Sequence, residues 1–264
     1  MIPRIYLAAE RLAGQSDIQL DSDQTNYLLQ ALRLKDGDAL QVFDGIGHRF
    51  SATVRTEGRR ACRVIIDEPA TGSSPPSPVR TILLQGLAAS ERMDWVIEKS
   101  VELGVNVIVP VRCARSSVKL DAERASRRSA HWQRITVAAC MQSGRDDLPQ
   151  LAPLSLLTDL LDARPLAPPV AAPALMLVPG ASQPLTEWLA THARSVQDSG
   201  AMSLLIGPES GLNPQEIDLA ARAGFTAVGL GPRILRTETA GLVALSLIQG
   251  MLGDLQPGTD SHRA

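Results

Sequence analysis

A short segment rich in proline and serine divides the sequence into two parts of different character. Residues 71–78 read Thr-Gly-Ser-Ser-Pro-Pro-Ser-Pro, and a run with so many prolines cannot continue a helix or a central strand. We therefore expect a linker between two domains. The predicted boundaries are a first domain over 1–72, a linker over 73–78, a second domain over 79–255 and a disordered tail over 256–264.

The first domain is predicted to be rich in β-structure. Apolar and polar residues alternate over 40–43 and over 49–54, and Asp-Gly-Ile-Gly at 44–47 is typical of the turn between them. Residues 62–66 have the character of a further strand, whereas 23–34 has helical periodicity. This pattern predicts a small β-barrel that carries one helix, near the lower size limit for an independent domain.

The second domain alternates short apolar strands with helices. Strands are expected at 79–84, 105–111, 174–178, 203–206 and 227–230. Helices are expected at 91–103, at 122–142, near Pro184 and Pro214, and at 240–252. This order predicts an α/β fold with a parallel sheet that is covered on both faces. The last helix is apolar almost all round, which predicts that it is buried.

Composition narrows the class of protein. Hydrophobic residues make up 44% of the chain and charged residues 20%, which supports a buried core and excludes general disorder. The sequence has no apolar run of the roughly 18 residues that a membrane span needs, and its start lacks the apolar run of a secretion signal. The cysteines Cys62, Cys113 and Cys140 are far apart, so neither disulfides nor a metal site are expected. These features favour a reduced, cytoplasmic protein.

One stretch of the chain is strongly basic although the formal net charge is only −2. Residues 112–145 contain eight Lys and Arg side chains against Asp121 and Glu123. A local excess of positive charge on a nearly neutral protein indicates a site for a polyanion. A solvated helix face explains the same charges, and the sequence alone does not separate the two interpretations.

Two glycine-containing loops follow consecutive predicted strands. Residues 204–212 contain Gly-Pro-Glu-Ser-Gly, and residues 228–240 contain Gly-Leu-Gly-Pro-Arg-Ile-Leu-Arg-Thr-Glu-Thr. The phosphate-binding patterns GxxxxGK[ST] and GxGxxG after a strand are absent from the sequence, as is GxSxG. In open α/β sheets, ligands bind beyond the carboxyl ends of the strands, where both loops begin. Gly-Pro pairs also make simple tight turns, but a turn does not explain the charged residues gathered in both loops.

These loops resemble those of the SPOUT methyltransferases, and the likeness extends to the bacterial 16S ribosomal RNA uridine-N3 methyltransferase family. It rests on four stretches, at 91–95, 98–105, 142–145 and 230–240. Pro3-Arg4, Leu32-Arg33 and Phe43-Asp44-Gly45 resemble the small PUA-like domain of that family.

The resemblance implies both an architecture and a set of partners. The implied fold is α/β, with a C-terminal SPOUT-type parallel sheet, a deep trefoil knot and a small N-terminal PUA-like β-barrel. The implied cofactor is S-adenosyl-L-methionine, the implied substrate is 16S rRNA within the small ribosomal subunit, and the implied assembly is a homodimer. Membrane and metal are not implied.

S-adenosylmethionine carries a sulfonium cation and an uncharged adenine, so its pocket requires backbone hydrogen bonds and apolar walls. The residues expected to bind it are Leu177, Val178, Pro179, Ile206, Gly207, Pro208, Gly211, Leu230, Gly231, Ile234, Leu235, Thr237, Thr239 and Ala240. Thr237 or Thr239 is also a candidate to cap the last helix, and Glu238 suits its first turn.

Methylation at N3 of uridine requires that an imide proton leave and that the resulting anion be stabilised. Arg236 is the candidate for that electrostatic role, because a guanidinium stays charged and offers two donors. Glu209 is the candidate for proton acceptance or substrate orientation. In the alternative interpretation, Glu209 and Arg236 form a structural ion pair between the loops.

RNA binding is assigned to exposed basic residues, because phosphate contacts position a nucleic acid. The candidates are Arg4, Arg33, Arg92, Arg115, Lys119, Arg124, Arg127, Arg128 and Arg145. A single-stranded or splayed uridine is expected, since N3 is hidden in a paired base.

The sequence departs from the family in two places. Ser210 stands where the family usually has glycine, and serine would be strained there if the position needs a positive φ. Ala89-Ser90 replaces a basic residue and glycine, which removes one expected phosphate contact. Two other functions stay open: methylation of another nucleoside or of a ribose hydroxyl, and RNA binding in ribosome assembly without catalysis.

Overall fold

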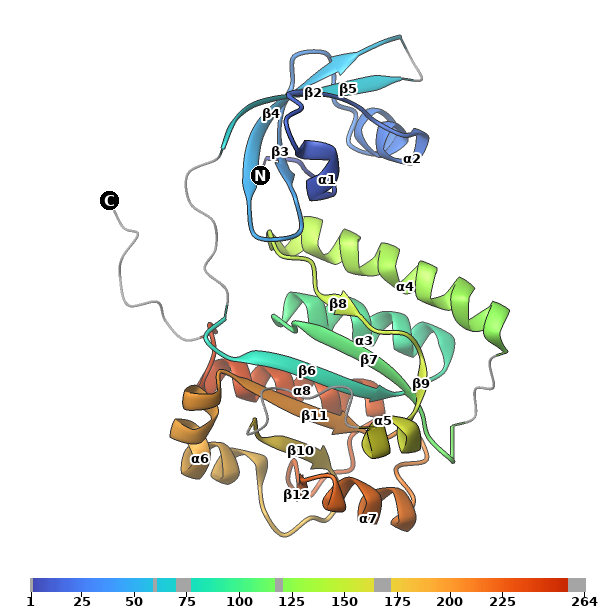
Figure 1. Ribbon diagram of the computed structural model, residues 1–264, viewed down its shortest axis with the longest axis vertical. Coiled ribbons are helices and arrows are strands. Elements are labelled where there is room, and N and C mark those ends of the chain that lie inside the picture. The colour runs from blue at the N-terminus through green and yellow to red at the C-terminus, as the bar shows by residue number, and fades with distance from the viewer. Residues whose placement is uncertain (1, 59–60, 70–76, 117–120, 164–171, 256–264) are drawn as a thin grey trace. The chain divides into compact units, whose positions relative to one another are not determined.

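The computed structural model describes residues 2–58, 61–69, 77–116, 121–163 and 172–255 (Figure 1). The predicted tail over 256–264 and most of the predicted linker lie outside the described residues. The chain forms two compact units. The first comprises Met1–Pro76 and Val137–Leu148, and the second comprises Ser77–Thr136 and Pro149–Ala264.

The first unit contains a five-stranded sheet with the order β1-β3-β4-β5-β2. Its strands are β1 (Arg4–Tyr6), β2 (Asp17–Gln19), β3 (Ala39–Phe43), β4 (Arg49–Thr56) and β5 (Cys62–Pro69). The β1–β3 pair is parallel and the other pairs are antiparallel, with a register shift in β4 at Ser51/Ala52. Apolar residues from all five strands form a buried core with Leu28, so the β-rich prediction for this part is confirmed.

The helical pattern over 23–34 becomes two short helices instead of one. An α-helix, α2 (Ser22–Asn26), begins at a capping box made by Asp21 and Gln24, and a π-helix, η1 (Tyr27–Ala31), continues it. A further short helix, α1 (Ala9–Leu12), lies between β1 and β2. The prediction overran the end of η1 because Arg33 takes a left-handed conformation, with φ of 58°, which ends a right-handed helix.

The second unit is built on a parallel sheet with the order β12-β10-β11-β6-β7-β8, and β9 also pairs with β7. Its strands are β6 (Arg80–Gly86), β7 (Val107–Arg112), β8 (Gln150–Leu151), β9 (Ser155–Leu156), β10 (Ala174–Leu177), β11 (Ala201–Ile206) and β12 (Phe225–Val228). β6 and β11 lie at the centre, and nearly all of their residues are buried. The predicted covered parallel sheet is confirmed.

Helices cover this sheet (Figure 1). They are α3 (Ser90–Glu102), α5 (Leu157–Ala163), α6 (Leu185–Ser199), α7 (Pro214–Arg222) and α8 (Thr237–Met251). A further helix, α4 (Ala122–Ser143), is divided between the two units at Thr136 and Val137. α8 packs against α3, α6 and the central strands, whereas α5 packs against α7. None of the helices within the described ranges is both long and apolar enough to cross a membrane.

α8 is less completely buried than its sequence predicted. Gly241, Ala244, Leu245 and Ile248 are buried on one side. On other sides Leu242, Val243, Leu247 and Met251 are only half-buried. The helix also begins at Thr237, three residues before the predicted start.

The cysteines are buried free thiols. Burial raises the pKa of Cys113 to about 12 and that of Cys140 to about 12. Within the described residues there is no group of three or more His, Cys, Asp or Glu side chains that could hold a metal ion.

A buried carboxylate holds the loop after α4 within the first unit. Asp146 is 2% exposed, and its oxygens accept hydrogen bonds from Arg4 Nη2 at 2.7 Å and from Arg49 at 2.7 and 3.0 Å. Arg4 also donates to the carbonyl of Arg145 and lies over the Phe43 ring. Burial lowers the pKa of the Arg4 guanidinium, and the Asp146 charge opposes that shift. The two arginines therefore depend on this one carboxylate.

We expect Asp146→Asn to destabilise the first unit by about 3 kcal/mol, because the buried Arg4 and the partly buried Arg49 lose their counter-charge. Hydrogen exchange read by mass spectrometry should then be faster in β1 and β4. Asp198→Asn is the matched control: among the described residues its one ion pair is an exposed contact with Arg194 at 3.9 Å, and such pairs contribute little. Equal exchange in both variants would contradict the assignment.

Candidate functional site

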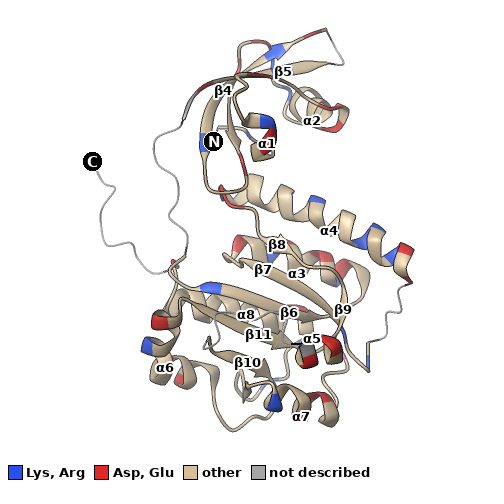
Figure 2. Cartoon of the chain, viewed as in Figure 1, with Lys and Arg blue, Asp and Glu red and all other residues tan. Residues whose placement is uncertain are grey.

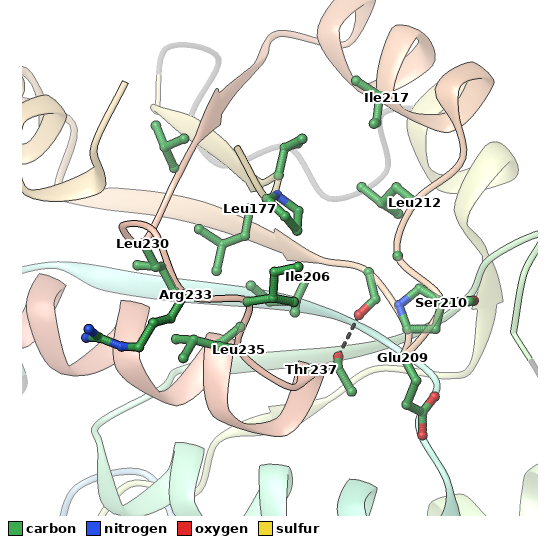
Figure 3. A pocket seen from close by; sticks show the side chains of 18 of the residues that line it. Leu177, Ile206, Glu209, Ser210, Leu212, Ile217, Leu230, Arg233, Leu235 and Thr237 are labelled. Carbon is green, nitrogen blue, oxygen red and sulfur yellow. Dashed lines mark hydrogen bonds between the residues drawn. The ribbon is translucent and has the colours of Figure 1, made fainter. Parts of the chain in front are cut away.

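A pocket of about 380 Å³ opens at the carboxyl ends of β10, β11 and β12 (Figure 3). It lies between three segments: the residues after Leu177, a first loop over 207–213 and a second loop over 229–236. The first turn of α8 closes one side through Thr237 and Ala240. Its volume is in the range of small-molecule sites.

The pocket gathers most of the residues that the sequence assigned to a cofactor. The residues of that set that line it are Leu177, Val178, Pro179, Ile206, Gly207, Pro208, Gly211, Leu230, Gly231, Ile234, Leu235, Thr237 and Ala240. Thr239 is not among the lining residues, because it is exposed on the outer side of α8. The prediction did not assign Ser210, Leu212, Ile217, Val228 or Arg233 to the cofactor. Val228 ends β12 as Leu177 ends β10, so the rule that selected Leu177 would also have found it.

Glycines are required where the first loop folds back on itself. A Cβ atom on Gly207 would lie 2.8 Å from the nitrogen of Leu212, which is too close for any side chain. Gly211 and Gly231 have φ of 71° and 92°, which favours glycine. Ser210 is not strained: among the described residues, Arg33 is the one non-glycine with positive φ. The hydroxyl of Ser210 instead donates to the carbonyl of Arg115 at 2.7 Å.

The lining suits a largely neutral ligand with hydrogen-bonding edges. Apolar side chains form the walls, and Figure 3 shows Arg233 and Glu209 pointing away from their centre. Among the described residues, no protein acceptor receives the backbone N–H of Leu230, Gly231 or Leu235. Those peptide groups are free to bond a ligand, as an adenine ring requires. The donor set therefore fits S-adenosylmethionine, and it offers no cluster of cationic groups for a phosphate chain.

Glu209 connects the first loop to the start of α3. Its Oε1 accepts hydrogen bonds from the backbone N–H of Ala89 at 2.8 Å and from Arg92 Nη1 at 3.2 Å. Arg92 Nε also lies 3.7 Å from Glu238 Oε1. The alternative pairing of Glu209 with Arg236 is therefore wrong: the partner is Arg92, because Glu209 points toward α3 rather than toward the second loop.

Arg236 stands beside the pocket with a free side chain. It is the N-cap residue of α8, with φ of −66° and ψ of 154°, and it is exposed. Its guanidinium makes no hydrogen bond or ion pair with the part of the chain that the structure describes. Neither threonine caps α8, contrary to the prediction. Thr237 is buried and follows the N-cap position; its hydroxyl donates to the carbonyl of Gly207 at 2.6 Å and accepts from Gln85 Nε2 at 2.9 Å, so its oxygen is engaged away from the helix end.

The basic residues fall into two groups. Arg115, Arg124 and Arg127 are exposed, and Arg92 and Arg128 are partly exposed; Figure 2 marks the basic positions along α4 in blue. Their partners are weak surface pairs or a hydroxyl, as in the hydrogen bond from Arg128 to Ser90.

The other basic candidates do not belong to this group of exposed or partly exposed arginines, or lie in another part of the chain. Arg4 is buried on Asp146, and Arg145 pairs with Asp147 at 2.5 Å while being 14% exposed. The prediction that these two grip RNA is corrected, because both guanidinium groups are occupied by carboxylates. Arg33 is exposed in the first unit. Lys119 lies outside the described residues.

Comparisons with known proteins agree on one family. The model of an RNA methyltransferase domain matches residues 75–249, and that of an RNA methyltransferase PUA domain matches residues 20–67. The ribosomal RNA small subunit methyltransferase E of Mycobacterium tuberculosis is 31% identical over 229 residues, covering 87% of this chain and 84% of its own. The Bacillus subtilis protein of the same name is 25% identical, covering 92% and 94%.

Solved structures give the same result. A ribosomal RNA small subunit methyltransferase E from Neisseria gonorrhoeae, bound to S-adenosyl methionine, superposes with a TM-score of 0.84 and 34% identity, over 97% of this chain and 100% of that one. A Legionella pneumophila methyltransferase in complex with the same cofactor gives a TM-score of 0.83 and 30% identity, with the same coverage.

Proposed function

The chain belongs to the RNA methyltransferase family that carries a PUA domain, and from this premise we propose which atom it methylates and which residues act. It is an S-adenosylmethionine-dependent ribosomal RNA methyltransferase. The proposed target is N3 of a uridine in the 16S RNA of the small ribosomal subunit. The observation that carries the proposal is the pocket between the two loops, whose lining fits this cofactor.

The reaction replaces the N3 proton of uracil with a methyl group. S-adenosylmethionine supplies that methyl group from its sulfonium: the S–CH₃ bond breaks and the N3–CH₃ bond forms. The chain must therefore align the two atoms and favour the uracil anion that remains when the N3 proton leaves. The base must be unpaired, because N3 lies on its pairing edge.

Arg236 is proposed to stabilise the uracil anion. Its guanidinium is exposed, free of carboxylate partners among the described residues, and adjacent to the lining residues Leu235 and Thr237. The N-terminus of α8, which begins after Arg236, adds partial positive charge at the same place.

Glu209 is proposed to orient the substrate rather than to serve as a free base. Its Oε1 is held by Ala89 and Arg92, so the side chain is fixed in direction. The Arg92 guanidinium beside it is partly exposed and can contact a phosphate or the base.

The exposed arginines Arg92, Arg115, Arg124, Arg127 and Arg128 are proposed to bind RNA phosphates, together with Arg33 in the first unit. Arg4 and Arg145 are left out because each is paired with an aspartate. We also propose a cytoplasmic location, because the proposed substrate is ribosomal RNA.

Incubation of the purified protein with unmethylated small subunits and S-adenosylmethionine should yield 3-methyluridine, identified by nucleoside mass spectrometry. Ala240→Leu should reduce the yield at least about tenfold, because the larger side chain occupies the pocket without straining a helix. Ala190→Leu, the same substitution on the exposed side of α6, is the matched control. A different methylated nucleoside would refute the N3 assignment, and full activity of Ala240→Leu would refute the pocket.

Arg236→Ala should lower the single-turnover rate about a hundredfold, or about 3 kcal/mol, and change RNA affinity little. Replacing both Arg127 and Arg128 by alanine should do the reverse: RNA binding weakens and its salt dependence flattens, while the rate at saturating RNA stays similar. Filter binding and rapid-quench methylation measure the two quantities. If Arg236→Ala loses only RNA affinity, Arg236 is another phosphate contact.

A homodimer is proposed, supported by the half-buried apolar side of α8 formed by Leu242, Val243, Leu247 and Met251. Sedimentation velocity at micromolar concentration should give a species of twice the 28.2 kDa chain mass. Leu247→Glu should shift it toward the monomer, because an apolar interface does not accept an unpaired charge. A stable 28.2 kDa species for the unaltered protein would overturn the proposal.

A further inference from the structure

Gln85 is a fully buried polar side chain at the centre of the sheet. It lies near the end of β6, where every residue from Thr81 to Gly86 is buried, and its own exposed fraction is 0%. Its carboxamide is on the side of the sheet that faces α8, next to Gly241. A buried amide is costly unless it is hydrogen-bonded, so its contacts indicate why it is there.

The carboxamide begins a chain of hydrogen bonds that ends at the cofactor pocket. Gln85 Nε2 donates to the hydroxyl of Thr237 at 2.9 Å and to the carbonyl of Gly86 at 3.1 Å. The Thr237 hydroxyl then donates its single proton to the carbonyl of Gly207 at 2.6 Å. Thr237 and Gly207 both line the pocket, whereas Gln85 does not.

The direction of this chain follows from proton counting. Because the Thr237 proton goes to Gly207, the group on its other side must be a donor, and only the NH₂ end of Gln85 meets that need. The oxygen Oε1 has no hydrogen-bond partner among the described residues. In this arrangement Gln85 Oε1 stays buried without a hydrogen bond, while Nε2 donates to the Thr237 hydroxyl.

We propose that Gln85 is a positioning residue for the cofactor, acting through Thr237 on the first loop. It holds the start of α8 and the carbonyl of Gly207 at a fixed separation, so that both sides of the pocket keep the shape of the bound state before binding. This inference rests on the proposed function of the pocket. Fixing loops in advance strengthens binding because less order is lost when the ligand enters.

Calorimetric titration with S-adenosylmethionine tests the proposal. Gln85→Leu and Thr237→Val each remove one link at nearly constant size, and each should raise Kd about fivefold to tenfold, the effect of one neutral hydrogen bond. The double variant should bind about as weakly as either single variant, because both break the same chain. Thr237→Ser keeps the hydroxyl and should lose less affinity than Thr237→Val.

Thr81→Val is the matched control. Thr81 is buried on the same strand, and its hydroxyl has no hydrogen-bond partner among the described residues, so the same kind of substitution should leave Kd unchanged. Methylation kinetics give an independent measure: KM for S-adenosylmethionine should rise in Gln85→Leu, whose side chain lies outside the pocket, while kcat at saturating cofactor changes less than about twofold.

Several outcomes would overturn the proposal. One is a folded Gln85→Leu protein with the Kd of the unaltered protein and only a lower melting temperature, which would make Gln85 structural. Losses that multiply in the double variant would mean that the two residues act separately. If Gln85→Leu does not fold, an unchanged Kd in Thr237→Val is decisive. Failure of the unaltered protein to bind S-adenosylmethionine would instead overturn the proposed function.

Discussion

The site depends on the close approach of two backbones beneath the pocket. A Cβ atom on Gly86 would lie 2.4 Å from the nitrogen of Pro208 and 2.6 Å from the carbonyl carbon of Gly207, so the end of β6 admits only glycine there. This contact brings the first loop down onto the centre of the sheet. Thr237, 152 residues after Gln85 in the sequence, then ties the same loop to α8. The shape of the pocket depends on this arrangement, because the first loop and the start of α8, which form two of its walls, are held by contacts with the end of β6 and with each other.

In the proposed function, this pocket recognises the cofactor mainly through peptide groups and apolar surface. Neither requires a charged side chain in the lining, and Figure 3 shows that both charged lining residues point outward. The charged side chains near the pocket instead connect its loops to neighbouring elements or stay exposed at its edge. Glu209 fastens the first loop to α3, Arg92 joins Glu209 to Glu238, and Arg236 stays free. Binding and chemistry are thus assigned to different kinds of group, the first to backbone and the second to side chains at the rim.

The sequence predicted the parallel sheet and the pocket, but it did not predict which charged side chains form ion pairs. Apolar strands and the glycines after them have local patterns, which is why most of the lining residues of both loops were found in advance. The burial of Arg4 has no local signal, since its partner Asp146 is 142 residues away. The alternative pairing of Glu209 with Arg236 was wrong for the same reason: its partners Ala89 and Arg92 are 120 and 117 residues away. The early end of the helix at Ala31 depends on one left-handed residue, Arg33, whose type does not predict that conformation.

The positive charge around the pocket acts differently on the two reactants of the proposed reaction. The N-terminus of α8 and the free guanidinium of Arg236 repel a sulfonium cation and attract a uracil anion. The carboxylates of Glu209 and Glu238, which both lie beside Arg92 of α3, offset part of the repulsion of the sulfonium. Methyl transfer removes both the sulfonium charge and the uracil charge at once. The repulsion between the sulfonium and this positive charge therefore ends in the same step in which the uracil anion is neutralised. The N-terminus of α8 and Arg236 thus stabilise the reactive uracil anion but do not attract the uncharged methylated base.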